Sequence, residues 1–196
     1  MKDLPARRFH PVVFLPDQYD VLDFTVPASR RPPSTSRFSI GRYDEDRVIY
    51  TQDLFDGSER RTVHVGLDIG GPVGTAVHAF SEGTVLHAGY NPADGDYGHV
   101  IVTRHVLGGV ELFALFGHLD SATLVDSPVG RRFGEGEVLG RLGADDENGG
   151  WPPHVHIQLS WERPATHDMP GVVTSSQRED ALRRFPDPRL VLGPLY

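Results

Sequence analysis

Two apolar runs flank a glycine pair in the stretch His99-Val-Ile-Val-Thr-Arg-His-Val-Leu-Gly-Gly-Val-Glu-Leu-Phe-Ala-Leu-Phe116. Short runs rich in β-branched and aromatic residues indicate strands, and the glycines between them indicate a turn. Similar runs lie on both sides of this stretch, each bounded by Gly, Asn, Pro or Asp. The predicted strands are Ala76–Phe80, Gly83–Ala88, His99–His105, Val110–Phe116, Val138–Leu142 and His154–Trp161.

Glycine and proline interrupt these runs throughout the chain. The sequence has 22 glycines and 16 prolines, which is typical of a β domain with many turns. Glycines are spaced closely in Gly134-Glu-Gly136 and Val138-Leu-Gly140, where the chain must bend sharply between short strands. We therefore predict a mainly β fold, an antiparallel barrel-sandwich.

The two ends of the chain have different sequence patterns from the central part. Pro27 to Arg37 reads as a loop, and Phe38 to Thr51 alternates as a strand pair would. Near the C-terminus, Ser176-Gln-Arg-Glu179 has the pattern of a capping box and predicts a short helix to Arg184, ended by Pro186. We expect an N-terminal extension (1–60) that packs on the core, a central β domain (61–161) and a C-terminal extension (162–196).

Composition restricts the partners. Of the 196 residues, 38% are hydrophobic and 23% are charged, which is typical of a globular chain. The net charge of -8 argues against nucleic acid and anionic membranes, and no run is long enough to span a bilayer. The absence of cysteine excludes disulfides and thiolate ligands.

No export signal stands out near the start. The apolar run Val12 to Leu15 is too short for a signal peptide, and no small-residue cleavage site follows it. We expect a soluble chain that is cytoplasmic as given, or a cell-wall, extracytoplasmic one if residues had been removed from its start.

Two motifs could bind a metal ion. His154-Val-His156 lies on a predicted strand, where alternate side chains share a face, so the two imidazoles can share a metal or divide between metal and substrate. His64-Val-Gly-Leu-Asp68 supplies a further imidazole and a carboxylate. Two His and one Asp form a catalytic zinc set that leaves a position for water, whose pKa zinc lowers. The alternatives are incidental histidines on an exposed strand and an Asp68 that caps a turn.

The remaining histidines carry weaker signals. His118 ends an apolar strand, where it either packs at the rim of the core or holds the attacking water or an oxyanion. For His105 we favour a structural role. No role is assigned to the others, which are His10, His78, His87, His99 and His167.

The order of these pieces resembles the lysostaphin-type (LytM-like) zinc metalloendopeptidase family. His64-x-x-x-Asp68 comes first, then Gly74-Thr-Ala-Val-His-Ala79 and Gly83-Thr-Val85, then Phe116-Gly-His-Leu119, and finally His154-Val-His156. The resemblance covers about residues 61–161 and implies that family's sandwich, a duplicated hybrid motif. Relatives cleave peptide cross-links in bacterial peptidoglycan.

The resemblance also implies roles for five residues. The metal ligands fall on His64, Asp68 and His156, for one Zn²⁺ per chain. The two non-ligand histidines fall on His118 and His154, which in the family flank the activated water and the scissile carbonyl. We therefore expect an amide hydrolase in which one of these two acts as general base and the other stabilises the oxyanion.

Three features depart from the family pattern. Phe116 replaces the usual Tyr, so one phenol is missing near the cleft, and Glu147-Asn-Gly-Gly-Trp-Pro-Pro153 reshapes one wall. No export signal is visible. The segment before His154 and the tail beyond Met169 are closest to a metallopeptidase-like module that also occurs in multidomain proteins beside kinase-like and aminotransferase domains, so other domains or enzymes are potential partners.

Several functions remain open from the residues. A cell-wall endopeptidase competes with a cytosolic hydrolase of another peptide or small amide. A non-catalytic metal-binding regulatory module is disfavoured because all three ligand positions are filled. His64-Val-Gly-Leu-Asp68 is also similar to a motif of glucose-specific phosphocarriers, but His154-Val-His156 is not part of that pattern.

Overall fold

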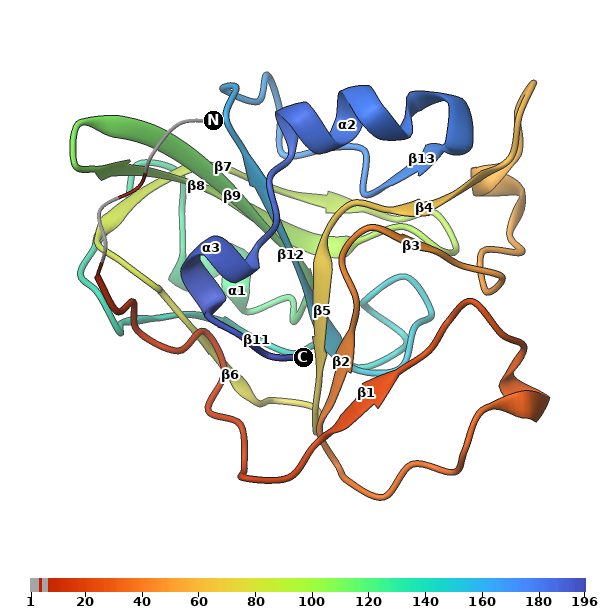
Figure 1. Ribbon diagram of the computed structural model, residues 1–196. Helices are drawn as coiled ribbons and strands as arrows, with labels where there is room; N and C mark the ends of the chain where they lie inside the picture. The colour runs from red at the N-terminus through yellow and green to blue at the C-terminus, as the bar shows by residue number, and fades with distance from the viewer. Residues whose placement is uncertain (1–3, 5–6) are drawn as a thin grey trace.

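An eight-stranded sheet organises the computed structural model, which describes Leu4 and residues 7–196 (Figure 1). All neighbouring strands in it are antiparallel except the parallel pair at one edge, β1 with β2. Its strands, in spatial order, are β1 (Asp20–Leu22), β2 (Ser39–Gly41), β5 (Leu67–Gly70), β12 (His154–Ser160), β9 (Val110–Leu119), β8 (Gly98–Leu107), β7 (Gly83–Asn91) and β10 (Arg132–Phe133).

Two small sheets and short helices complete the described fold. One sheet pairs β6 (Ala76–His78) with β11 (Val138–Arg141), and the other joins β13 (Val172–Thr174), β4 (Arg61–His64) and β3 (Glu45–Asp46). The helices are α1 (Thr123–Asp126), α2 (Arg178–Arg184) and α3 (Arg189–Leu192), with 3₁₀ turns η1 (Ala28–Arg30), η2 (Asp53–Phe55) and η3 (Ser175–Gln177). The fold is mainly β with a short C-terminal helix, as predicted.

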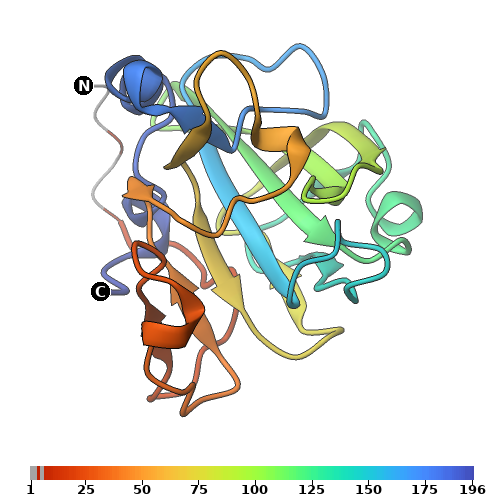
Figure 2. The same ribbon diagram turned by 90° about the vertical axis from the view of Figure 1, so that its right-hand side faces the viewer.

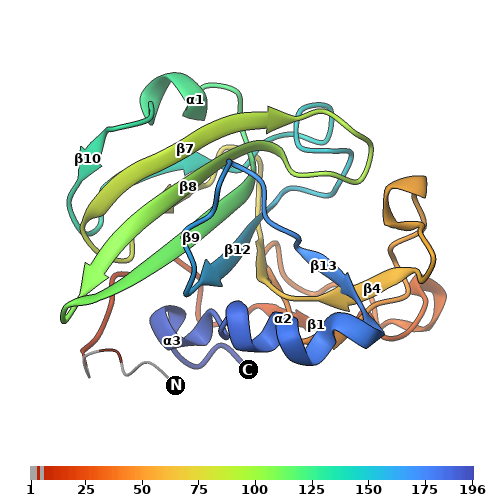
Figure 3. The same cartoon turned by 90° about the horizontal axis from the view of Figure 1, so that it is seen from above.

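β8 and β9 are buried on both faces over most of their length, which explains their nearly continuous apolar sequence. Ile101 and Phe116 point into a core that includes Val77 and Leu139 of the small sheet β6–β11. Their neighbours along the strands, among them Val102, belong to a second core with Ala181 of α2. Figure 3 shows β7, β8, β9 and β12 side by side, with α2 along one side of them.

The six predicted strands form, with their ends shifted by a few residues. The predicted strand pair in Phe38–Thr51 is wrong, because the two strands of this stretch do not pair with each other. β2 joins the large sheet beside β5, whereas β3 pairs with β4 in the small one. Asp44, between them, has a φ of 56°, and this left-handed turn sends the chain from one sheet to the other.

The C-terminal helix forms over the predicted residues but is capped differently. The Gln177 side chain accepts a hydrogen bond from the Thr174 amide, so the box lies two residues earlier than predicted. Ser176 instead donates its amide and hydroxyl to the Glu59 carboxylate, which a local pattern could not anticipate.

The segment before residue 60 shares sheets with the rest of the chain. Its strands β1 and β2 extend the large sheet beyond β5, where Figure 2 shows this part in red to orange. Nearer its start, the His10 amide donates to the Phe80 carbonyl and the Val12 carbonyl accepts from the His78 amide, beside β6. The division of the chain at residues 60 and 161 stays a prediction. Residues 1–3 and 5–6 of the stretch searched for an export signal lie outside the described residues. Within the described part, every helix is too short or too polar to cross a membrane.

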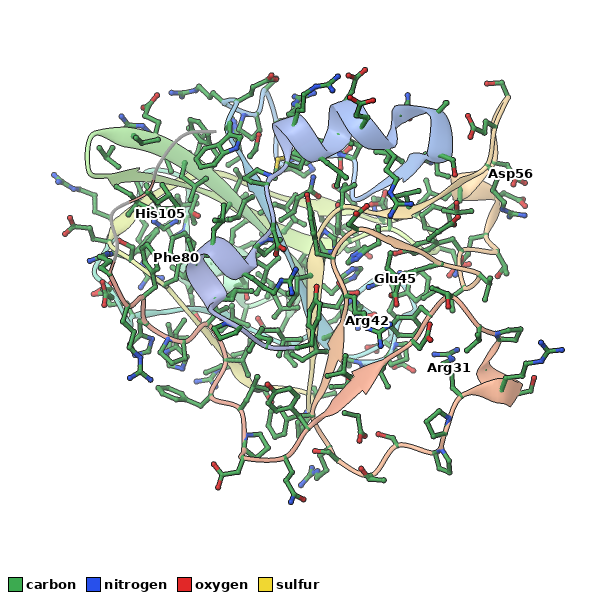
Figure 4. All side chains as sticks on the ribbon, in the orientation of Figure 1. Arg31, Arg42, Glu45, Asp56, Phe80 and His105 are labelled. Carbon is green, nitrogen blue, oxygen red and sulfur yellow. The ribbon has the colours of Figure 1, made fainter. Side chains whose placement is uncertain are left out.

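His105 illustrates how the core holds a polar side chain. It is fully buried and stacks on Phe80 with ring centroids 4.2 Å apart (Figure 4). Its Nδ1 donates to the Glu82 carbonyl at 2.9 Å, and its Nε2 accepts from the Thr103 hydroxyl at 2.8 Å. Burial lowers the pKa of His105 to about 4, so the ring is neutral near pH 7.

This buried ring makes stability depend on pH. At pH values between 6.5, the ordinary pKa of histidine, and about 4, His105 is protonated in the unfolded chain but neutral in the native protein. The free energy of unfolding therefore decreases as pH falls, by up to about 1.4 kcal/mol per pH unit for this side chain. His105→Gln should have a shallower pH slope than the wild type in urea denaturation between pH 7 and pH 5. Equal slopes would contradict a neutral, buried His105.

Candidate metal centre

Strand register brings the three predicted ligands together. His156 on β12 lies directly opposite Asp68 on β5. His64 is the last residue of β4, and only Val65 and Gly66 separate it from β5, so the chain crosses between two sheets beside the same point. Gly66 permits this crossing, because a Cβ there would collide with the His156 ring.

The donor atoms form a small triangle. His64 Nε2 lies 2.9 Å from His156 Nδ1 and 3.2 Å from Asp68 Oδ1, and the remaining side, His156 Nδ1 to Asp68 Oδ1, is 3.1 Å. All three residues are buried. Tetrahedral zinc with ligand distances near 2.0–2.1 Å needs ligand atoms about 3.3 Å apart. The triangle therefore has the size of one face of a zinc tetrahedron.

The outer nitrogens of both imidazoles face oxygen acceptors. His64 Nδ1 donates to the Arg42 carbonyl at 2.9 Å, and His156 Nε2 faces Gln158 Oε1 at 3.3 Å. With a proton on each outer nitrogen, the inner nitrogens direct lone pairs at the Asp68 carboxylate. Burial, aided by Arg47, lowers the pKa of His64 to about 4 and keeps it neutral. Two lone pairs and a carboxylate oxygen at one point suit a divalent cation.

Arg47 binds the second carboxylate oxygen of Asp68, the one that points away from the two histidines. Its Nη1 lies 2.6 Å from Asp68 Oδ2, and its Nε lies 2.9 Å from Glu45 Oε2, with the whole guanidinium buried. Burial raises the pKa of Asp68, but its charged and hydrogen-bonding neighbours, among them the Arg47 guanidinium, outweigh this and hold it well below its usual value. No sequence motif singles out Arg47, because its importance comes only from the partner it meets in space.

His118 and His154 flank the triangle, and a backbone carbonyl orients each ring. Nδ1 of His118 donates to the Asn148 carbonyl and Nδ1 of His154 donates to the Pro152 carbonyl, both at 2.7 Å. Their ring centroids are 4.2 Å apart, and His154 Nε2 lies 3.9 Å from Asp68 Oδ1. Burial lowers the pKa of both rings, so each is neutral with a free lone pair on Nε2.

His118 has an unusual backbone. Its φ of 62° lies in the left-handed region, which non-glycine residues rarely adopt, while its amide donates to the Tyr97 carbonyl at 2.8 Å. Such strain persists only where surrounding contacts enforce it, and it is concentrated at functional sites.

The segment that departs from the family pattern shapes this part of the site. Asn148 is fully buried, and its side-chain amide binds the carbonyls of Gly143 and Trp151, so it fixes the loop that orients both rings. Trp151 and the two prolines after it line a cleft, as predicted.

The prediction of a missing phenol near the cleft is wrong in its placement. Phe116 is fully buried in the core and does not line the cleft, because its position on β9 points away from the face that carries His156. The phenols of Tyr50 and Tyr97 line it instead.

The cleft has a volume of about 550 Å³, and all five predicted site residues line it. The histidines that line it are His64, His118, His154 and His156, and the other six of the ten do not. His105 lies in the core, in agreement with its predicted structural role.

Gly66→Ala tests whether Gly66 leaves room for the His156 ring at the candidate metal site. The added methyl overlaps the His156 ring and displaces it, so zinc affinity should fall by about 10- to 100-fold in a chelator competition assay. Gly134→Ala is the matched control, since a Cβ there would meet no atom closer than 4.0 Å. Equal zinc affinities for the two variants would contradict the arrangement.

Arg47→Met tests the buried ion pairs. Without the guanidinium, Glu45 and Asp68 are left as uncompensated buried carboxylates, so unfolding of the metal-free protein in urea should cost about 3–5 kcal/mol less. Arg60, paired with Asp56 on the surface, is the control, and Arg60→Met should cost at most about 1 kcal/mol. The account fails if Arg47→Met is no more destabilising than Arg60→Met.

Known proteins match this site region. The sequence profile of peptidase family M23 matches residues 62–168, more than half of the chain. No curated protein matches the chain.

Similar solved structures include three peptidases. One is a candidate M23 peptidase from Pseudomonas aeruginosa, 22% identical over 67% of this chain and 44% of its own, with a TM-score of 0.43. Another is a zinc-containing peptidase from Vibrio cholerae, 19% identical over 78% of this chain and 36% of its own (TM-score 0.47). The chain thus spans less than half of the length of these two. The third is the catalytic domain of lysostaphin from Staphylococcus simulans, 21% identical over 59% of this chain and 77% of its own (TM-score 0.40).

The profile match includes all five residues that gather in the cleft. These are His64, Asp68, His118, His154 and His156. Membership of the family follows from this sequence match over more than half of the chain. The chain therefore belongs to peptidase family M23, the zinc metalloendopeptidases, and keeps an intact His–Asp–His set.

Proposed function

We propose that the chain hydrolyses an amide bond of a peptide, with one Zn²⁺ held by His64, Asp68 and His156. The observation that carries this proposal is the buried triangle of donor atoms, all within 4.8 Å of one another, beside two further imidazoles in a cleft. A site that only stabilised the fold would be closed by a fourth protein ligand, whereas this donor set leaves a position for a reacting molecule.

The residues around the triangle suit a hydrolytic step. When bound, zinc supplies a Lewis acid that polarises the substrate carbonyl and lowers the pKa of water. His118 and His154 carry their protons on Nδ1, which the loop carbonyls hold, so each offers Nε2 to the cleft as a proton acceptor. Either can take the proton of the attacking water, and the resulting N–H can then stabilise an oxyanion or protonate the leaving amine.

By family default, the substrate is a peptide cross-link of bacterial peptidoglycan. A cytosolic hydrolase of another peptide, including one that works beside kinase-like or aminotransferase domains, uses the same residues and is the alternative. The filled ligand set and the two positioned imidazoles support catalysis over a purely regulatory metal site.

The two histidines of β12 should separate binding from catalysis. His154→Ala should keep stoichiometric zinc but lower the turnover number by at least about 100-fold, since it removes a proton acceptor and no ligand. His156→Ala should lose both zinc and turnover. Metal analysis of the purified variants and hydrolysis of purified peptidoglycan, beside short Gly-rich and Ala-rich peptides, measure the two effects.

His78→Ala is the control for this pair. His78 lies on β6, outside the cleft, and its loss should leave zinc content and turnover unchanged. An empty site in His154→Ala would show that the roles of the pair are assigned wrongly. Cleavage of the short peptides without cleavage of peptidoglycan would favour the alternative substrate.

A further inference from the structure

One wall of the cleft comes from a segment that precedes the family match. The match begins at residue 62, whereas the wall is formed by residues 22–55. Its apolar members are Leu22, Phe24, Ile49, Leu54 and Phe55. With Trp151 also lining the cleft, this surface favours apolar side chains of a bound peptide over bare glycine backbone, because apolar surface gains by leaving water.

Three arginines line the cleft, and two of them are engaged by the protein. Arg47 binds the carboxylates of Glu45 and Asp68. Arg61 donates to the Leu54 carbonyl and lies over the Phe55 ring. Arg47 is thus held by two buried carboxylates, and Arg61 is oriented by the Leu54 carbonyl and the Phe55 ring.

The third arginine, Arg31, is not engaged in this way. It follows η1 directly and lies between η1 and the chain that carries Arg42 and Glu45 (Figure 4). Its Nε is buried, yet no hydrogen-bond acceptor meets it among the residues that the structure describes. The carboxylate of Asp23, in the same segment, accepts from the amide and hydroxyl of Thr25, and these bonds, with Arg42 and Arg31 nearby, lower its pKa. Asp23 makes no hydrogen bond to Arg31 among the described residues, so its charge offsets that of Arg31 only at a distance.

A single aromatic ring fixes Arg31 relative to the metal centre. The Phe24 ring contacts two guanidiniums, with Cζ of Arg31 at 4.7 Å and Cζ of Arg47 at 4.8 Å from its centroid. The two Cζ atoms are therefore no farther apart than the sum of these distances, and Arg47 contacts the ligand Asp68 at 2.6 Å. Extended peptide advances about 3.3 Å per residue, so these contacts place Arg31 within about five residues of the metal centre along a bound peptide.

We infer that Arg31 selects the substrate by binding a carboxylate, either of an acidic side chain or of a free C-terminus. A guanidinium recognises a carboxylate through paired N–H donors, and a half-buried one does so with little competition from water. An apolar residue between this carboxylate and the cleaved bond packs on the Phe24 wall. The inference rests on the proposed peptidase function and adds its substrate class: acidic, partly apolar peptides rather than glycine chains.

Paired peptides test this inference. One probe is an N-acetylated, C-amidated alanine peptide with a leucine followed by a glutamate, and the other replaces the glutamate by glutamine. A second pair differs only in a free or amidated C-terminus, which separates the two sources of carboxylate. For the zinc-loaded wild type, kcat/KM and binding affinity should favour one acidic probe by roughly tenfold or more.

Arg31→Gln should reduce that preference to about onefold by lowering affinity and kcat/KM for the acidic probe, while zinc content stays at one ion per chain. Arg37→Gln is the matched control, since Arg37 is an exposed arginine of the same segment outside the cleft, and it should keep the preference. Affinity is measured by calorimetry whether or not the probes are cleaved. Acid preference in binding without cleavage would count against the peptidase function but support the role of Arg31. Equal affinity of the wild type for acidic and neutral probes, or an unchanged preference in Arg31→Gln, would overturn the inference.

Discussion

The buried carboxylate of Asp68 is the group on which the rest of the site depends. An isolated carboxylate in a protein interior is costly, so it must be paired on every side that water has left. Oδ1 faces His64 and His156, and Oδ2 faces Arg47. Each oxygen thus has a distinct task, one toward the metal position and one toward the protein.

Through Arg47, the segment before residue 62 is linked to the part of the chain that matches the family. Arg47 comes from the segment before the family match, and its second carboxylate partner, Glu45, lies on β3 beside His64 of β4. The N-terminal segment is therefore part of the centre that it covers. The same segment supplies the apolar wall with Phe24, whose ring lies against Arg47 and Arg31. The three candidate ligands, the cleft wall and Arg31 are thus joined by one continuous set of contacts.

Backbone carbonyls set the protonation of the imidazoles. His64, His118 and His154 each present Nδ1 to a carbonyl, from Arg42, Asn148 and Pro152 respectively. Burial then disfavours a second proton and lowers the pKa of all three. The loop 147–153 therefore orients His118 and His154 through its main-chain carbonyls, while the buried Asn148 side chain holds the loop itself in place.

The mainly β fold and the six central strands could be predicted from the sequence, and the order of the motifs singled out His64, Asp68, His118, His154 and His156, which line one cleft. This was possible because strand periodicity and turn glycines are local, and because motif order indicates which residues meet. Other features could not be predicted and depend on how the chain folds: the pairing of β2 and β3 with different sheets, the burial of Phe116 in the core, and the contacts of Arg47 and Arg31. These depend on segments far apart in the chain, and a side chain whose role comes from a distant partner leaves no periodic or local signal in the sequence.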